Sequence, residues 1–416
     1  MPDQTDGRET DAPVVVVGAG AAGLATVDAL RAGGHAGGIM LVGEEAHAPY
    51  DRPPLSKQVL AGTWEPARVT LRSVEDLAAA RVDCRLGVRA VGADPDARTL
   101  ALSDGSVLAY RDLVVATRAG ARRLPFGHDL EGVHVLRDLD DVLGLKAALD
   151  RRDGARVVVV GAGFLGAEVA AVARDLGSEV SLVDTLELPL RSVLGAEVGA
   201  MVADLHREHG VALHLGRGIA SFTAASGAVS AVVLDEGTEL PADLVVVAIG
   251  AVPEVDWLRG TTIPIAGESP DEGAGGIRCD EVGRAGDHVY AVGDVAAWWS
   301  PRENRFVRLE HRLTATEHAR TVSRELIGLS REAAAPVPYF WSDQYDLKLQ
   351  AFGLPSGGDE FRVVEGTLAD RRFVGVYGHA GRVSAVIGAG KAKAVRQWRQ
   401  AVAEGRSWDE VGSTTA

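Results

Sequence analysis

The 416-residue chain has few of the residues that build covalently stapled scaffolds, because its only cysteines are Cys84 and Cys279. Two cysteines so far apart exclude a disulfide framework, a CxxC redox pair and a cysteine zinc site. We interpret both as small apolar side chains. The sequence also lacks an apolar run of about 18 residues, the length that a membrane-spanning helix needs. We therefore expect no membrane segment.

Positive charge is scarce as well. Lysine and arginine number 43 against 58 acidic residues, which gives a net charge of −15. Such a surface repels nucleic acids and anionic membranes, so neither is an expected partner. Residues 1–11 are polar and acidic, without the apolar core of a signal peptide. We expect a disordered tail there, on a cytoplasmic protein.

Glycine, by contrast, is abundant, and two stretches place it in the same pattern. "VVVVGAGAAG" begins at Val14 and "VVVVGAGFLG" begins at Val157. A β-branched run predicts a buried parallel strand, and the residues that follow predict a helix. In a dinucleotide fingerprint the first glycine makes the turn, the second admits the pyrophosphate and the third lets helix and strand pack closely. The predicted phosphate-binding glycines are Gly18, Gly20 and Gly23 in the first turn, and Gly161, Gly163 and Gly166 in the second.

An acidic residue follows each third glycine by about 20 positions, where such a fold places the carboxylate that binds an adenosine ribose. These residues are Glu44 and Asp184, each after a second apolar run. A carboxylate at Asp184 repels a 2′-phosphate, which predicts NADH rather than NADPH. Arg191 is close enough in the sequence to leave that preference open.

The two glycine units predict an α/β chain with two Rossmann-like domains, one nested in the other, and a small α+β C-terminal domain. "YRDLVVATRAG" (110–120) resembles "PADLVVVAIGAVP" (241–253), and each fits a strand by which the chain leaves a nucleotide domain. After 336 the apolar residues alternate as in antiparallel strands, before a closing helix. The predicted boundaries are 12–118 with 253–335 for an FAD-binding domain, 119–252 for an NAD-binding domain and 336–416 for the last domain.

Several stretches together resemble one family. "PYDRPPLSK" (49–57), "AVGDVA" (291–296) and "PYFWSDQYDLKLQAFG" (338–353), with the glycine turns, are similar to the FAD- and NADH-dependent ferredoxin reductases of oxygenase and cytochrome P450 systems. These belong to the pyridine nucleotide-disulfide oxidoreductase superfamily but lack its redox disulfide. The resemblance implies an oxidoreductase that passes electrons from NADH through FAD to a ferredoxin, which serves a cytochrome P450 or Rieske-type oxygenase.

The resemblance also implies three catalytic residues. Lys57 is expected near flavin N5, where its charge stabilises the reduced ring. Glu168 is expected to pair with Lys57 or to meet the nicotinamide amide, and Trp341 to lie near the flavin or the electron exit. Taken alone, Lys57 also fits a surface lysine after two prolines, Glu168 an exposed helix residue and Trp341 a core side chain.

Other family positions are expected to contact a cofactor, with Asp294 on the ribityl chain. Asp294 taken alone also fits a turn or a helix N-cap. No metal ligand set is evident, and we interpret His206 and His209 as a solvated helix end. The full predicted cofactor-binding set is Gly18, Gly20, Ala22, Gly23, Glu44, Arg52, Lys57, Val88, Arg137, Asp294, Arg312, Gly161, Gly163, Phe164, Leu165, Gly166, Asp184 and Gly250.

The chain departs from the family pattern at three places. Arg118 stands where the family usually has glycine, in "ATR". Ser192 stands where an arginine is usual, with Arg191 displaced by one position. "EHRLTA" (310–315) replaces "EHWTNA", which puts Arg312 near the expected flavin edge.

The expected partner is a small acidic iron–sulfur protein, which needs a local basic surface to dock on an acidic reductase. Oligomeric state stays open between monomer and homodimer. Other functions that fit are an NADH-dependent rubredoxin reductase, an NADH oxidase, or a non-turnover flavin and NAD sensor resembling apoptosis-inducing factor. The candidate docking residues are Arg302, Arg305, Arg308 and Arg312, and Lys391, Lys393, Arg396 and Arg399.

Overall fold

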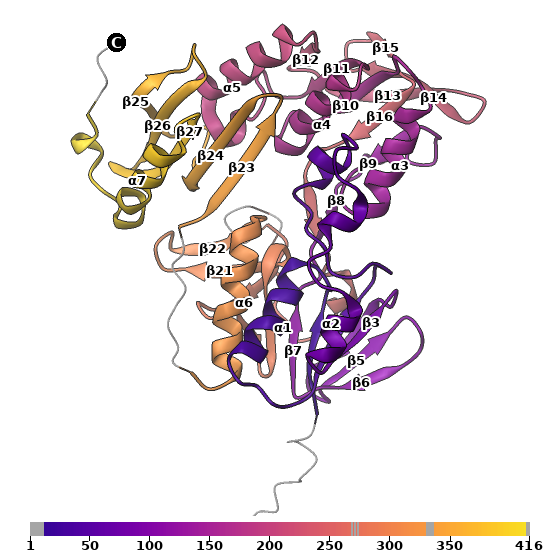
Figure 1. Ribbon diagram of the computed structural model, residues 1–416, viewed down its shortest axis with the longest axis vertical. Helices are drawn as coiled ribbons and strands as arrows, with labels where there is room; N and C mark the ends of the chain where they lie inside the picture. Colours follow the sequence, from indigo (N-terminus) through magenta and orange to yellow (C-terminus); the bar gives the residue numbers. More distant parts are fainter. Residues whose placement is uncertain (1–11, 268, 270–271, 273, 330–336, 413–416) are drawn as a thin grey trace, which may run out of the picture. The chain divides into compact units, whose positions relative to one another are not determined.

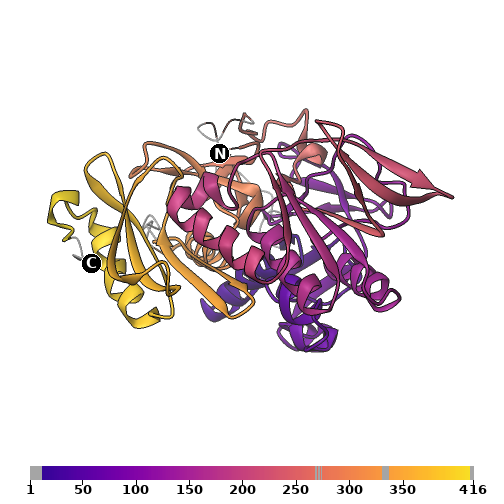
Figure 2. The same ribbon diagram turned by 90° about the horizontal axis from the view of Figure 1, so that it is seen from above.

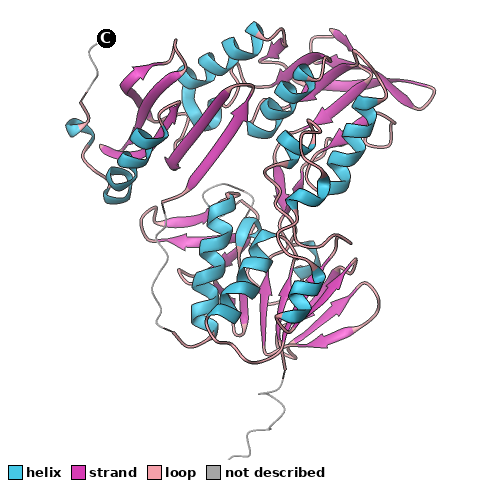
Figure 3. Ribbon diagram, viewed as in Figure 1, coloured by secondary structure: helices cyan, strands magenta, loops and turns pink. Residues whose placement is uncertain are grey.

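The computed structural model describes residues 12–412, apart from 268, 270–271, 273 and 330–336, so the predicted tail 1–11 lies outside the described residues. The described residues form both helices and strands (Figure 3). The residues group into two compact units, which we describe separately. The first comprises Met1–Asp51, Val69–Gly120 and Val252–Pro336, and the second comprises Arg52–Arg68, Ala121–Ala251 and Val337–Ala416.

The first unit is built on a six-stranded sheet with the order β19-β20-β7-β1-β2-β3. Its central strand β1 is the predicted valine run, and it pairs in parallel with β2 and β7. The four valines are at most 3% exposed, which fits a strand covered on both faces. The strands are β1 (Val14–Val17), β2 (Ile39–Gly43), β3 (Val82–Leu86), β7 (Asp112–Val115), β19 (Arg284–Gly286) and β20 (Val289–Ala291).

Helices α1 and α6 pack side by side in this unit (Figure 1), and the Ser323 hydroxyl donates to the Thr26 carbonyl over 3.2 Å. Cys279 lies buried in the same core, as an apolar filler would. The helices are α1 (Ala21–Ala32), α2 (Val74–Ala79) and α6 (Arg312–Leu326). Two small sheets contain β4 (Ala90–Asp94), β5 (Thr99–Leu102) and β6 (Val107–Ala109), and β18 (Ile277–Cys279), β21 (Ala296–Ser300) and β22 (Arg305–Arg308).

The second unit repeats the plan with a five-stranded parallel sheet in the order β12-β11-β10-β16-β9. β16 lies beside β10 as β7 lies beside β1, so the two similar sequence stretches occupy equivalent strands. The predicted nested α/β fold is confirmed. The elements are β9 (Val133–Val135), α3 (Leu139–Asp150), β10 (Arg156–Val160), α4 (Phe164–Asp175), β11 (Glu179–Asp184), α5 (Arg191–Glu208), β12 (Ala212–Leu215) and β16 (Leu244–Val247).

A five-stranded antiparallel sheet, in the order β23-β24-β27-β26-β25, completes the second unit. Successive residues of β26 point to opposite faces of the sheet and pack in different cores: Phe373 packs with side chains of α5, and Val374 with side chains of α7. The sheet therefore lies between the two helices (Figure 2), which explains why its central strands are apolar on both faces. The elements are β23 (Tyr339–Gln344), β24 (Leu347–Gly353), β25 (Glu360–Thr367), β26 (Arg372–His379), β27 (Arg382–Ala389) and α7 (Ala392–Glu404).

The remaining strands are a three-stranded sheet and two connecting strands. The predicted domain boundaries stay a prediction; segment 52–68, expected within the FAD-binding domain, groups with the second unit. The sheet contains β13 (Ile219–Ala225), β14 (Ala228–Leu234) and β15 (Glu239–Pro241), and the connecting strands are β8 (Ala119–Ala121) and β17 (Ala251–Pro253).

Candidate active site

The first glycine turn joins β1 to α1. Gly18 has a φ of +115°, and a Cβ there would come within 2.1 Å of the Ala116 carbonyl oxygen. A Cβ on Gly23 would come within 1.9 Å of the Gly18 carbonyl oxygen. Gly20, which begins α1, has no described atom within 4 Å of its Cβ position. Two glycines thus close the turn, and the middle one leaves space at the helix N-terminus.

The second turn, between β10 and α4, has the same construction. Gly161 has a φ of +103°, and its Cβ position lies 2.3 Å from the Ala248 carbonyl oxygen. The Cβ position of Gly166 lies 1.8 Å from the Gly161 carbonyl oxygen, while Gly163 again faces no described atom within 4 Å. A diphosphate fits both turns, because each middle glycine leaves space at a helix start, where the backbone N–H groups bind phosphate.

The acidic residues after the two turns differ in their partners. Glu44 is exposed at the end of β2. Asp184, half-buried at the end of β11, accepts hydrogen bonds from the backbone N–H of Ala162 over 2.6 Å and of Leu186 over 2.8 Å. Each carboxylate oxygen has a second lone pair, so Asp184 keeps acceptor capacity for a ribose.

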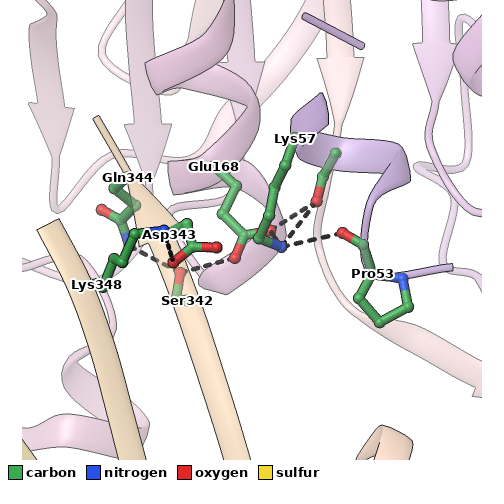
Figure 4. A network of polar contacts seen from close by, with 8 residues as sticks. Pro53, Lys57, Glu168, Ser342, Asp343, Gln344 and Lys348 are labelled. Carbon is green, nitrogen blue, oxygen red and sulfur yellow. Dashed lines mark hydrogen bonds and ion pairs between the residues drawn. The ribbon is translucent and has the colours of Figure 1, made fainter. Parts of the chain in front are cut away.

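Lys57 and Glu168 form an ion pair in the second unit (Figure 4). The Lys57 ammonium lies 2.6 Å from Glu168 Oε2, and the two side chains are only 11% and 6% exposed. Lys57 comes from the helical turn Leu55–Val59 and also donates to the Pro53 carbonyl, whereas Glu168 comes from the first half of α4. Of the two contacts expected for Glu168, the structure places the one with Lys57.

Two serines complete the surroundings of this carboxylate. The Ser56 hydroxyl donates to Glu168 Oε2 over 2.6 Å, and the Ser342 hydroxyl donates to Oε1 over 2.8 Å. Both serines are buried. Three donors therefore compensate the desolvation of a buried carboxylate. Sequence reasoning missed both serines, although the alternation of β23 places Ser342 on the buried face, opposite Trp341.

Comparison with known proteins agrees with this geometry. Residues 12–320 match the pyridine nucleotide-disulphide oxidoreductase family, and residues 339–412 match the reductase C-terminal family. The chain belongs to the pyridine nucleotide-disulphide oxidoreductase family. It is therefore an oxidoreductase whose cofactors are FAD and a nicotinamide dinucleotide, and the two glycine turns fit them.

Individual relatives cover nearly the whole chain. A ferredoxin–NAD(P)+ reductase of Sphingomonas sp is 37% identical, over 91% of this chain and 89% of its own length. Putidaredoxin reductase of Pseudomonas putida is 36% identical, over 90% and 87%. A crystal structure of the covalent putidaredoxin reductase–putidaredoxin complex matches with a TM-score of 0.87 and 33% identity, covering 95% of this chain and 94% of the other. The chain is thus similar, over nearly its whole length, to reductases named for ferredoxin and putidaredoxin.

Some of the predicted flavin residues of the first unit lie near its glycine turn. The methyl group of Ala22 lies 2.8 Å from the Cβ position of Gly293, which precedes Asp294. Asp294 is half-buried, and its carbonyl accepts a hydrogen bond from Arg308 over 3.0 Å. This places Asp294 on the same side of the unit as the first turn.

Two other predicted flavin residues of this unit have protein partners. The Arg312 guanidinium donates to Asp51 over 2.5 Å and to the Thr316 hydroxyl over 2.9 Å. The Val88 N–H donates to the Gly43 carbonyl over 2.9 Å, which holds it beside the end of β2. Arg312 is thus an ion-paired residue at the start of α6.

Predicted residues of the second unit fall into two groups. The Arg52 guanidinium donates to the Arg137 carbonyl over 2.5 Å, and the Arg137 N–H donates to Asp141 over 2.8 Å. Phe164, at the start of α4, has its ring 5.1 Å from that of Phe340. Arg52 and Arg137 thus lie together.

Three predicted residues lie apart from the ion pair's polar contacts. Trp341 is half-buried, with its ring stacked 5.9 Å from that of Tyr339. Leu165 is half-buried in the first turn of α4. Gly250 is exposed, has a φ of +97° and accepts a hydrogen bond from the Arg122 N–H over 2.9 Å. Their roles toward a cofactor stay predictions.

Arg118 occupies a backbone conformation that favours glycine. Its φ is +68°, and its guanidinium lies 3.4 Å from Glu45. Tyr50 also donates to Glu45. The departure from the family pattern therefore places a cation and backbone strain beside the first turn. Ser192, the second departure, accepts a hydrogen bond from the Gly357 N–H through its carbonyl.

The interpretation of His206 and His209 as a solvated helix end is wrong for His206. His206 is 0% exposed, because Tyr345 and Gln344 contact it. Burial lowers the pKa of His206 to about 4, so the imidazole is neutral. His209 stacks on Tyr345 with ring centroids 3.7 Å apart.

Two features are absent from the described part of the chain. None of its helices has the length and apolar character required to cross a bilayer. It also contains no cluster of three or more side chains suited to hold a metal ion.

Proposed function

We propose that this oxidoreductase passes electrons from NADH through FAD to a ferredoxin that serves a cytochrome P450 or Rieske-type oxygenase. The observation that carries the proposal is the pair of equivalent glycine turns in one chain, together with a buried Lys57–Glu168 ion pair on the helix of the second turn. FAD, when bound, takes up an electron pair from a nicotinamide and releases electrons one at a time. The relatives are ferredoxin and putidaredoxin reductases by name, which supports a ferredoxin as the acceptor.

Lys57 supplies positive charge where the reduced ring carries negative charge. Its ammonium is held by Glu168 and by the Pro53 carbonyl, so its position needs little reorganisation. Glu168 in turn is fixed by Ser56 and Ser342, which leaves an oriented carboxylate for the nicotinamide carboxamide.

The nicotinamide is NADH. Asp184 is anchored to the turn by two backbone N–H groups and presents its negative charge where a 2′-phosphate of NADPH would lie. Arg191, the nearby cation that left this preference open, is half-exposed at the start of α5.

The ferredoxin docks on α7. Among the candidate cations, Arg308, Arg312 and Lys391 already form ion pairs. In contrast, Lys393, Arg396 and Arg399 are exposed, and their spacing places them on one face of the helix. Arg396 is also close enough to Tyr339 to lower the pKa of its hydroxyl, against the larger effect of burial, and Tyr339 stacks on Trp341. A basic stripe thus adjoins the expected electron exit.

A rubredoxin is the second candidate acceptor. A rubredoxin–NAD+ reductase of Pseudomonas putida is 33% identical to this chain, over 82% of it and 86% of its own length. The same stripe would serve a rubredoxin whose surface is acidic.

The test is an anaerobic titration of the yellow holoprotein with NADH, followed by stopped-flow mixing with ferredoxin or rubredoxin. Fast flavin reduction and fast reoxidation by ferredoxin are expected; reduction without reoxidation by either acceptor contradicts the proposal. Replacing Lys393, Arg396 and Arg399 together by glutamine should raise the KM for ferredoxin and leave flavin reduction unchanged. The matched control replaces Arg302 and Arg305 by glutamine. A larger rise in the KM for ferredoxin in that variant would place the docking site there instead of on α7.

A further inference from the structure

The hydrogen bonds around Glu168 continue away from Lys57 as a single buried chain. Beyond Ser342, the Gln344 amide nitrogen lies 3.2 Å from the Ser342 hydroxyl, and Gln344 Oε1 lies 3.1 Å from His206 Nε2. His206 Nδ1 lies 3.3 Å from the Tyr345 hydroxyl. Ser342, Gln344 and His206 are at most 1% exposed. The chain thus joins α4, β23 and α5 within the second unit.

Donor and acceptor chemistry gives this chain one direction. An ionised Glu168 only accepts, so the Ser342 proton points to it, and Ser342 must accept from the Gln344 amide group. Gln344 Oε1 then faces His206 and requires a proton on Nε2. A neutral imidazole carries one proton, so Nδ1 accepts from the Tyr345 hydroxyl. Every donor therefore points toward Glu168.

The surroundings of His206 keep it neutral. Burial is the main cause of its lowered pKa, and His209 on the same helix adds repulsion. Tyr345 has a raised pKa because of burial and Asp175, which Arg174 partly opposes. Tyr345 therefore stays protonated and able to donate.

We propose that this chain of hydrogen bonds couples the ionisation of Glu168 to the tautomer of His206. Ser342, Gln344 and His206 are then positioning residues for the Glu168 carboxylate. The coupling itself does not depend on the proposed function; only its effect on flavin reduction rests on that function. In the opposite state Glu168 is neutral and donates to Ser342. The Ser342 hydroxyl and the Gln344 amide then rotate, so that Ser342 donates to Gln344 Oε1 and the Gln344 amide nitrogen donates to His206 Nε2. The single ring proton of His206 lies on Nδ1 and is donated to the Tyr345 hydroxyl.

Glu168→Gln is expected to lock the chain in this opposite state. Lys57 and Ser56 both donate at the Oε2 position, so the new amide oxygen takes that place. The amide nitrogen then faces Ser342 as a donor. This predicts that His206 changes from the Nε2–H to the Nδ1–H tautomer, with no change in its charge.

The experiment is a long-range ¹H–¹⁵N correlation spectrum of holoprotein labelled at histidine nitrogens. The wild type should show His206 as Nε2–H, and Glu168→Gln should show it as Nδ1–H. His209 is an internal reference, because its Nδ1 bonds to the Leu205 carbonyl in either state. In the double variant Ser342→Ala/Glu168→Gln the chain is cut, and the wild-type tautomer should persist. A His206 tautomer that ignores Glu168→Gln overturns the coupling.

The consequence for flavin reduction is measured separately. Ser342→Ala should slow reduction by NADH about tenfold, the effect of losing one hydrogen bond to a charged group. Ser323→Ala, which removes a buried hydroxyl in the first unit, is the control and should leave this rate unchanged. An unchanged reduction rate in Ser342→Ala overturns the positioning role, whereas a wild-type flavin that NADH never reduces overturns only the proposed function.

Discussion

The two glycine turns of this chain have the same backbone construction but different surroundings. Both use a first and a third glycine where a Cβ would strike a carbonyl oxygen. Two residues past the third glycine, however, α1 has Ala25 where α4 has the buried Glu168. The two turns therefore share a backbone construction, but only the helix of the second carries a buried carboxylate.

The crossover strands after the two turns differ in a related way. Arg118 and Gly250 hold equivalent positions after β7 and β16, and both have positive φ values, +68° and +97°. Glycine adopts this conformation without cost, whereas arginine is strained there. A shared backbone thus tolerates different side chains when a local ion pair, here with Glu45, offsets part of the strain.

The largest expected effect comes from placing a methyl group on the first glycine of either turn. Gly18→Ala or Gly161→Ala should lower the free energy of unfolding by about 3 kcal/mol or more, because the methyl group meets backbone and the φ is unfavourable. Gly20→Ala and Gly163→Ala are the controls: the protein should fold, but lose FAD or NADH binding respectively. Chemical denaturation and flavin absorbance measure this, and equal stability of Gly18→Ala and Gly20→Ala would contradict it.

Lys57→Met tests the buried ion pair that only the helix of the second turn forms. Flavin reduction by NADH should slow about a hundredfold, as when a preorganised charge is removed from a developing anion. The free energy of unfolding should also fall by about 3 kcal/mol, because Glu168 stays buried without its cation. Lys146→Met, which removes a helical i,i+4 pair with Asp150, should cost at most about 0.5 kcal/mol. Similar losses in both variants would show that the Lys57 pair is ordinary.

Neutralising each acidic residue in turn should show which turn binds the nicotinamide dinucleotide and which binds FAD. Asp184→Asn should shift the ratio of kcat/KM values for NADH and NADPH about tenfold toward NADPH, because the repulsive charge is lost. The flavin content should not change. Glu44→Gln should weaken FAD retention and leave the nicotinamide preference as it is. Steady-state kinetics and the flavin-to-protein absorbance ratio check both, and a changed preference in Glu44→Gln would reverse the assignment of the turns.

The smallest effect is expected at Arg118. Arg118→Ala and Arg118→Gly both remove the contact with Glu45, so their difference isolates the backbone. The glycine variant should be more stable by about 1 kcal/mol, measured by chemical denaturation. Matching stabilities would mean that the positive φ of Arg118 is not retained.

Much of the fold could be predicted from local patterns. The valine runs at Val14 and Val157 became central parallel strands because uninterrupted β-branched residues suit burial on both faces. The spacing of the glycines after them located both turns, since the first and third glycines of each turn leave no room for a Cβ beside a carbonyl oxygen.

The surroundings of Glu168 were beyond such patterns. Ser56, Ser342 and His206 lie more than 30 positions from Glu168 in the sequence, and only folding brings their side chains into one buried chain. His206 illustrates the reason: its helix-end sequence predicts exposure, and β23 covers it. The amino-acid sequence by itself determined where the cofactor turns lie, because the strand, the glycines and the helix that define each turn follow one another along the chain. The tertiary structure alone decided which polar side chains meet at Glu168, because burial and hydrogen bonding depend on distant segments arriving together.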